Sequence, residues 1–260
     1  MSEAVIRVRG LRTKLSGKEI HKDLDLEVRK GEILGIVGGS GTGKSVLMRT
    51  ILGLIRPRAG TIEVLGRKVD PVDRETMLSL ERRWGVLFQD GALFSSLTVG
   101  ENVQVPMREH LKLPPVLADQ LAMLKIRLAG LKPEDANKFP SELSGGMRKR
   151  AALARALALD PDIVFLDEPT AGLDPVGAAQ FDALLKSLSR SLGFTVFLIT
   201  HDLDTLYAVT DRIAVLADKK VLVTAPIAEL ERHPHPWIQE YFHGPRGRAA
   251  KASAIVPATS

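Results

Sequence analysis

Short apolar runs alternate with segments of helical periodicity at both ends of the chain. A run of about four to eight apolar residues is typical of a buried strand, whereas apolar residues three or four positions apart are typical of a helix. On this basis we expect strands at 4–8, 24–28, 32–37, 61–69, 84–89, 163–166, 194–200, 213–217 and 221–224. We expect helices at 45–55, 73–83, 175–192, 203–210 and 237–242. This alternation predicts an α/β fold, a mostly parallel sheet with helices on both faces.

The middle of the chain has a different pattern. Between 98 and 159, prolines separate segments of helical spacing, with helices expected at 99–105, 116–128, 133–138 and 147–159. No strand-like run interrupts this block, which we interpret as a helical insertion. We therefore predict one domain over 1–243, with its core at 1–89 and 162–243 and a helical subdomain at 90–161. The segment 244–260 is rich in Gly, Pro, Ala, Arg and Ser and is predicted to be a C-terminal tail.

Composition excludes several classes of protein. The 260 residues are 45% hydrophobic and 26% charged, which excludes collagen-like, fibrous and wholly disordered chains. The net charge of +5 comes without a polybasic tail, so we expect no nucleic-acid partner. The absence of cysteine excludes disulfides, thiol catalysis and cysteine-based zinc sites, and favours a reducing compartment. No apolar run is long enough to span a bilayer and no secretory signal opens the chain, so work at a membrane would require a partner.

A glycine-rich segment follows the strand expected at 32–37 and precedes a helix. It matches the pattern G-x-x-x-x-G-K-[ST] of a phosphate-binding loop and consists of Gly38, Gly39, Ser40, Gly41, Thr42, Gly43, Lys44 and Ser45. Glycines let the backbone wrap closely around a polyphosphate, and the helix N-terminus turns N–H groups toward its oxygens. We expect Lys44 to reach the β- and γ-phosphates and the Ser45 hydroxyl to bind Mg²⁺. The alternative is an ordinary glycine-rich turn.

Two carboxylates follow the strand expected at 163–166. Ligands bind at the C-terminal ends of parallel strands, which is where Asp167 and Glu168 stand. We expect Asp167 to hold Mg²⁺ through water and Glu168 to act as the general base for the attacking water. The alternative, a solvated acidic pair at the end of a strand, is disfavoured by the phosphate-binding loop in the same chain.

The segment Leu143–Gly146, with the letters LSGG, lies directly before a predicted helix. Here the chain resembles the ATP-binding cassette (ABC) ATPases, whose motif in this position is LSGGQ; Met147 replaces the glutamine. The resemblance implies a P-loop NTPase (RecA-like) core with additional antiparallel strands and an inserted α-helical subdomain. It also implies a homodimer in which Ser144, Gly145 and Gly146 of one copy face the ATP held by the other.

Further landmarks of that family occur in order. Gln89 matches the glutamine that links Mg²⁺ and water to the membrane partner, Asp174 matches a loop at the dimer interface, and His201 matches the histidine that contacts the γ-phosphate. By this resemblance, Glu168 and His201 place water in line while Lys44 and Mg²⁺ neutralise charge. One landmark is missing, because 11–15 offers no aromatic residue to stack on adenine; Arg12 and Leu15 are the alternatives.

Five segments resemble one group within the family, the Mla-type phospholipid-trafficking ATPases: 21–28, 38–54, 85–103, 143–161 and 235–250. The resemblance implies phospholipid transport between the inner and outer membranes and a place on the cytoplasmic face of a bacterial inner membrane. It also implies an integral permease (MlaE-like), a STAS-domain protein (MlaB-like) and an MCE-type substrate-binding protein (MlaD-like). The alternatives are the ATPase of another ABC transporter for a small molecule and a soluble ABC ATPase that acts on nucleic acid. The latter is disfavoured, because the chain has no heptad run and only one cassette.

Two apolar segments are candidates for contacts. The segment 90–97 follows Gln89, where family members meet their permease, and the alternative is that its apolar residues belong to the chain's own core. The aromatic residues of 237–242 are expected to anchor that helix. The tail that follows is either disordered or docks on a neighbouring subunit.

Overall fold

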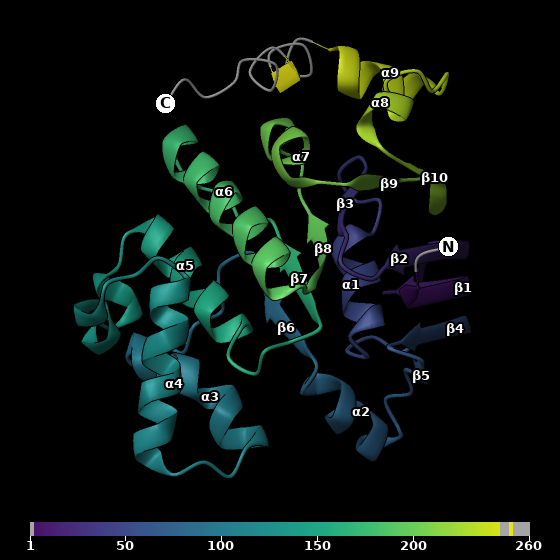
Figure 1. Ribbon diagram of the computed structural model, residues 1–260. Coiled ribbons are helices and arrows are strands. Elements are labelled where there is room, and N and C mark those ends of the chain that lie inside the picture. Colours follow the sequence, from purple (N-terminus) through teal and green to yellow (C-terminus); the bar gives the residue numbers. More distant parts are fainter. Residues whose placement is uncertain (1–2, 245–249, 252–260) are drawn as a thin grey trace. The chain divides into compact units, whose positions relative to one another are not determined.

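The structure is a computed structural model that describes residues 3–244 and 250–251 (Figure 1). Its contacts divide the chain into two compact units. Unit 1 comprises Met1–Met77 and Phe197–Ser260, and unit 2 comprises Leu78–Val196. The divisions fall within helix α2 (Arg74–Glu81) and within strand β8 (Thr195–Ile199).

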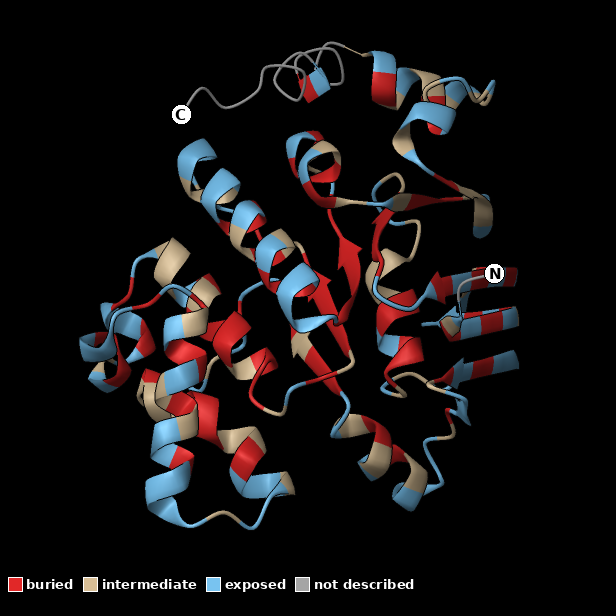
Figure 2. Ribbon diagram, in the orientation of Figure 1, coloured by how far each residue is buried: buried red, intermediate tan, exposed pale blue. Residues whose placement is uncertain are grey.

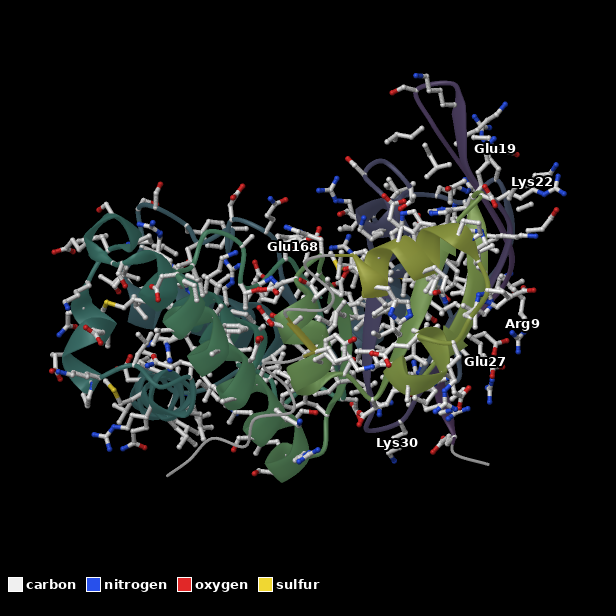
Figure 3. All side chains as sticks on the ribbon, turned by 90° about the horizontal axis from the view of Figure 1, so that it is seen from above. Arg9, Glu19, Lys22, Glu27, Lys30 and Glu168 are labelled. Carbon is white, nitrogen blue, oxygen red and sulfur yellow. The ribbon has the colours of Figure 1, made fainter. Side chains whose placement is uncertain are left out.

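Unit 1 begins with an antiparallel sheet. Strands β1 (Ala4–Leu15) and β2 (Lys18–Arg29) form a hairpin, β1 also pairs with β4 (Ala59–Val64), and β4 pairs with β5 (Arg67–Lys68). Both hairpin strands are much longer than the expected 4–8 and 24–28. Their outer residues are charged and alternate with buried ones, and Arg9 pairs with Glu27 across the strands (Figure 3). Because charged residues interrupt the apolar residues in these strands, the sequence contains no continuous apolar run that would predict their full length.

A second set of strands in unit 1 leads to the phosphate-binding loop. Strand β3 (Ile33–Val37) is buried throughout and runs parallel to β9 (Arg212–Ala217). Strand β10 (Lys220–Ala225) pairs with β9 in the antiparallel direction. Helix α1 (Lys44–Ile51) starts at the end of the loop that follows β3. This is the expected strand–loop–helix order.

Unit 2 contains a parallel strand pair and a helical cluster. Strand β6 (Trp84–Leu87) is parallel to β7 (Ile163–Asp167). The helices between them are α3 (Val99–His110), α4 (Pro115–Leu128) and α5 (Gly145–Ala156), with 3₁₀ segments at Pro133–Asn137 and Pro140–Glu142. They pack around buried residues that include Val103, Ile126 and Ala151. No strand lies between 98 and 159, all of which is described, as the sequence predicted.

Three local expectations differ from the structure in the bounds or the type of the element. The helix expected at 99–105 continues as α3 through Pro106 to His110. The segment expected to be helical at 133–138 is a 3₁₀ turn that begins with a proline. The strand expected at 61–69 is split into β4 and β5 by a turn in which Leu65 and Gly66 have positive φ.

Helix α2 was also mispredicted on one face. Met77 and Leu80 are buried as expected, but Leu78 is 40% exposed. Successive residues of a helix are about 100° apart, so Leu78 points away from the side that Met77 and Leu80 share. An apolar side chain on this helix is therefore accessible to solvent.

The remaining helices lie close to their expected positions. Helix α6 (Pro175–Leu192) has the predicted bounds, and Figure 2 shows exposed residues along its outward side. In unit 1, α7 (Leu203–Val209) and α9 (Pro236–His243) lie close to the expected 203–210 and 237–242. The short helix α8 (Ile227–Leu230) was not predicted. Within the residues that the structure describes, no helix is both long and apolar enough to cross a membrane.

The predicted tail lies mostly outside the described residues, which end at Gly244 apart from Ala250 and Lys251. These two residues pack on their own chain. Ala250 is buried in the cluster that contains Ile238 and Phe242 of α9, and Lys251 forms an ion pair of 2.7 Å with Glu231. At these two positions the chain is therefore not a free tail.

Candidate active site

The glycine-rich loop of unit 1 is closed around the side chain of Lys44. The ammonium group of Lys44 donates hydrogen bonds to the carbonyls of Gly38, at 2.8 Å, and Gly39, at 3.1 Å. Gly38 has φ 157°, and a Cβ there would lie 2.4 Å from the carbonyl oxygen of Leu216. Only glycine fits this position, so the backbone of the loop passes directly against Leu216 while the ammonium group of Lys44 is held by the loop's own carbonyls.

A buried histidine lies beneath the same loop. His21, on β2, is fully buried, and its Nδ1 is 2.7 Å from the hydroxyl of Thr13. A Cβ on Gly43 would lie 2.6 Å from Nε2 of His21. Burial lowers the pKa of His21 to about 4, and an interaction with the Gly43 backbone opposes only part of that shift. His21 was not predicted, because the alternation of buried and exposed residues along β2 places it with the exposed Asp23 and Asp25. It is buried because the pairing of β1 with β2 shifts register at this point.

Helix α9 contacts both the glycine-rich loop and the segment that carries His201. His201 follows β8 and is exposed, and its carbonyl accepts a 3.2 Å hydrogen bond from the hydroxyl of Tyr241. Tyr241 stacks on Trp237, with ring centroids 4.8 Å apart. A Cβ on Gly39 would lie 3.8 Å from Nε1 of Trp237. The aromatic residues of α9 anchor the helix as expected, since Phe242 is buried and Trp237 and Tyr241 pack against the same cluster. Tyr241 also contacts the segment of His201, and Trp237 lies beside Gly39.

The predicted carboxylates stand at the end of β7 in unit 2. Asp167 is the last residue of the strand and is only 4% exposed. Glu168 follows with φ 51°, in the left-handed region that residues other than glycine rarely adopt. A buried and a half-buried carboxylate thus occupy adjacent positions, and the roles expected of them stay predictions.

Lys149, on α5, joins the backbones of Gln89 and Glu168. Its ammonium group donates to the carbonyl of Gln89 and, at 3.1 Å, to the carbonyl of Glu168. Burial lowers the pKa of Lys149, and the nearby acidic residue Asp90 acts in the opposite direction, followed by Glu168 and Asp167. Lys149 was not predicted as a functional residue, because in the sequence it is one of several basic residues on an amphipathic helix.

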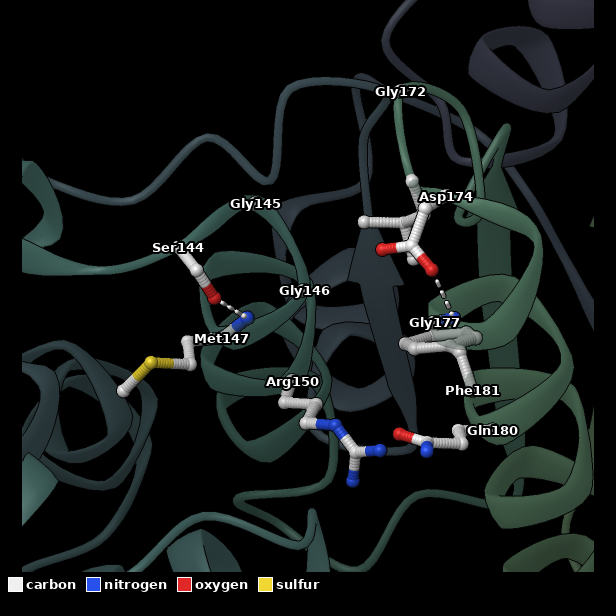
Figure 4. A pocket seen from close by; sticks show the side chains of 11 residues that line it. Ser144, Gly145, Gly146, Met147, Arg150, Gly172, Asp174, Gly177, Gln180 and Phe181 are labelled. Carbon is white, nitrogen blue, oxygen red and sulfur yellow. Dashed lines mark hydrogen bonds between the residues drawn. The ribbon is translucent and has the colours of Figure 1, made fainter.

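The segment with the letters LSGG and the segment that contains Asp174 line one cavity of about 350 Å³ in unit 2 (Figure 4). Ser144 is the N-cap of α5 and accepts a 3.2 Å hydrogen bond from the N–H of Met147. Asp174 is the N-cap of α6 and accepts one of 2.9 Å from the N–H of Gly177. Two helix N-termini therefore open onto this cavity, with Gly145 and Gly146 in the first turn of α5.

The candidates for adenine contact differ in their availability. The guanidinium of Arg12 makes two hydrogen bonds to the carboxylate of Asp23, at 2.8 and 2.9 Å. Leu15, at the end of β1, is 46% exposed. Arg12 is thus engaged by a carboxylate, and of the two residues only Leu15 presents an accessible apolar side chain.

The predicted Mg²⁺ donors are a hydroxyl (Ser45), an amide (Gln89) and a carboxylate (Asp167), all oxygen ligands of the kind Mg²⁺ prefers. The structure describes Ser45 in unit 1 and the other two in unit 2. Among the described residues, no three His, Cys, Asp or Glu side chains form a group that could hold a metal ion. Such a donor set fits Mg²⁺ that is held by one carboxylate and by nucleotide phosphates, and it does not suit a metal held by protein alone.

A strand, a glycine-rich loop closed on its lysine, and an Asp-Glu pair at the end of a parallel strand together define a P-loop NTPase. Residues 21–171 match the family model described as ABC transporter, and the chain belongs to this family of ATPases. Its members bind ATP.

Known proteins resemble this chain over most of its length. It is 38% identical to the intermembrane phospholipid transport system ATP-binding protein MlaF of Haemophilus influenzae, over 94% of this chain and 92% of the relative. It is 37% identical to the probable ribonucleotide transport ATP-binding protein mkl of Mycobacterium leprae, over 93% of this chain and 69% of the relative. The ATP-binding cassette MJ0796, solved as a dimer after hydrolysis with ADP and Pi, has a TM-score of 0.77 and 30% identity over 85% of this chain and 98% of its own. The chain is therefore an MlaF-like ABC ATPase and a subunit of a transporter.

Proposed function

We propose that this ATPase drives the movement of phospholipids between the inner and outer membranes through a separate permease. The observation that carries the proposal is the 38% identity to an MlaF protein, which extends over nearly the whole of both chains. Met147 supports it, because this residue replaces the usual glutamine in the segment that resembles the Mla-type group. Ribonucleotide transport is the second candidate, since the mkl proteins are 37% identical.

ATP is bound first by the loop 38–45. Its N–H groups and Lys44 contact the phosphates, in place of the carbonyls of Gly38 and Gly39 that Lys44 contacts in this structure. Ser45 and Gln89 are the proposed Mg²⁺ ligands, and Asp167 would hold the ion through water. Bound Mg²⁺ would neutralise charge on the phosphates during transfer.

The pocket is completed by a second copy of the chain. The cavity beside Ser144 is lined by the N-terminus of α5 and by Arg150, which favour an anion. This supports the expectation that Ser144, Gly145 and Gly146 contact the ATP of the partner copy. ATP then joins the two copies, and hydrolysis releases them.

Glu168 is the proposed general base, and it accepts a proton from the water that attacks the γ-phosphate. His201 contacts the γ-phosphate and positions that water. Asp174 orders the loop at the dimer interface. The Glu168→Gln variant is therefore expected to bind ATP while turning over slowly, and full turnover in that variant would remove Glu168 from this role.

The membrane partners are an integral permease, a STAS-domain protein and an MCE-type substrate-binding protein, with the ATPase on the cytoplasmic face of the inner membrane. The segment 90–97 is proposed to receive the permease. Phe94 is 51% exposed and suits such a contact, whereas Leu93 packs against the helical core of its own unit.

The cargo is tested by purifying the complex from native membranes and identifying its subunits and bound small molecules by mass spectrometry. Phospholipids and an MCE-type subunit are expected. A nucleotide permease that co-purifies would favour the second candidate, and an amino-acid or metal permease would contradict both.

A further inference from the structure

A single buried ammonium group connects three motifs of unit 2. Lys149 lies in α5, the helix that Ser144 caps, and its side chain reaches the carbonyls of Gln89 and Glu168. These two residues lie 60 and 19 positions away from Lys149 in the sequence. Their side chains carry two of the proposed catalytic roles, yet both are held here through their backbones.

Because Lys149 is buried, its ammonium group needs these hydrogen bonds in place of water. The residue is 7% exposed, and an ammonium group so placed must keep hydrogen-bond partners because losing its hydration is costly. Lysine offers three donors on one atom at the end of a flexible stem, so a single side chain satisfies two carbonyls that approach from different segments.

Both segments require such support. Glu168 has φ 51°, a strained conformation that persists only where the surroundings impose it. The loop after Gln89 contains Gly91 and Ala92, whose carbonyls accept hydrogen bonds of 2.8 and 2.7 Å from Arg155, also on α5. The same helix thus holds the loop at two points, and through Lys149 it also contacts the backbone of Glu168, whose carbonyl accepts a second hydrogen bond of 3.2 Å from the N–H of Ala171.

We propose that Lys149 is a positioning residue that fixes the spacing between Gln89 and Glu168 and ties both to the helix that begins at Ser144. Through this link, a displacement of α5 moves Gln89 and Glu168 together. The inference rests on the proposed roles of those two residues, and Lys149 itself does not contact the reacting atoms.

The test compares steady-state ATP hydrolysis by the full-length protein and by its Lys149→Met variant. Loss of a residue that orients catalytic groups typically lowers activity by about 10- to 100-fold, and we expect kcat to fall by that amount. We expect KM for ATP to change by less than about threefold, because the loop that binds the phosphates does not use Lys149. The chain has no cysteine, so Lys149→Cys can be alkylated at one site with 2-bromoethylamine under denaturing conditions and refolded. Restoring the ammonium group in this way should restore most of kcat.

Lys125→Met is the matched control. Lys125 is 3% exposed on α4 of the same unit and forms an ion pair with Asp160. Its loss should lower stability and leave kcat within about twofold. The proposal is overturned if Lys149→Met keeps kcat within twofold, if aminoethylated Lys149→Cys is no more active than the unalkylated variant, or if Lys125→Met loses as much kcat. Glu168→Gln, measured in parallel, tests the general base separately, because full turnover there contradicts the role of Glu168 whatever Lys149 does.

Discussion

The buried histidine beneath the glycine-rich loop predicts a specific dependence of stability on pH. In the unfolded chain the pKa of His21 is 6.5, and in the folded protein burial lowers it to about 4. Between these values the unfolded state binds more protons than the folded state, so the free energy of unfolding falls as pH decreases. The contribution of His21 is fully present above pH 6.5 and is lost as pH falls toward 4.

The magnitude follows from this difference in pKa. Linkage gives a loss of about 2 kcal/mol between pH 7.5 and pH 5, and about 3 kcal/mol once pH falls below 4. The variant His21→Asn keeps a polar group near the hydroxyl of Thr13 but has no group that titrates in this range. It should be less stable than the wild type at pH 7.5, and its stability should depend less on pH by about 2 kcal/mol.

Urea unfolding at pH 7.5 and pH 5 gives the free energy that each protein loses between the two pH values. Comparing this loss in the wild type and in His21→Asn cancels the pH-independent cost of the substitution. An NMR titration of the His21 imidazole gives the pKa in the folded state directly. The reasoning is refuted if wild type and variant lose the same free energy over this range, or if His21 titrates at pH 6 or above.

Two further predictions concern the loop lysine and a tight packing contact. Lys44→Ala should weaken ATP binding by about 10- to 100-fold in calorimetry, because a hydrogen bond to a charged group contributes about 1.5–3 kcal/mol; unchanged affinity would contradict the proposed role of Lys44. Gly85→Ala should lower the free energy of unfolding by about 3 kcal/mol or more, because the new Cβ would lie 1.9 Å from the carbonyl oxygen of Ala156. Gly100→Ala, whose Cβ would lie 3.2 Å from the carbonyl oxygen of Ala136, is the control; equal stability of the two variants would be inconsistent with this packing.

Features encoded by neighbouring residues could be predicted from the sequence. Helix α6 has its predicted bounds because Asp174 caps its N-terminus, Pro175 is its first residue and Gly193 ends it with φ 76°. The turn into α5 was likewise visible in the segment with the letters LSGG, since Ser144 caps that helix. In each case the information lies within a few positions of the boundary.

Features that depend on partners distant in the sequence could not be predicted. The β1–β2 hairpin extends beyond the predicted strands because exposed charged residues alternate there with buried ones, and a search for apolar runs does not detect this pattern. Nothing in the sequence distinguishes Lys149 or His21 from other residues of their type. Lys149 contacts the carbonyls of Gln89 and Glu168, and His21 lies against Gly43, only in the folded chain. Leu78 is exposed because Met77 and Leu80 occupy the buried side of the same helix, and the sequence does not show which side that is.

The central claim is that two copies of the chain share each ATP. A structure of the Glu168→Gln variant with ATP and Mg²⁺, by crystallography or cryo-electron microscopy, tests it most directly. The account predicts the hydroxyl of Ser144 within about 3 Å of a γ-phosphate oxygen of the ATP bound by the partner's Lys44. The account is contradicted if the Ser144 hydroxyl of one copy does not reach the γ-phosphate bound by the other copy, or if one copy alone encloses its ATP.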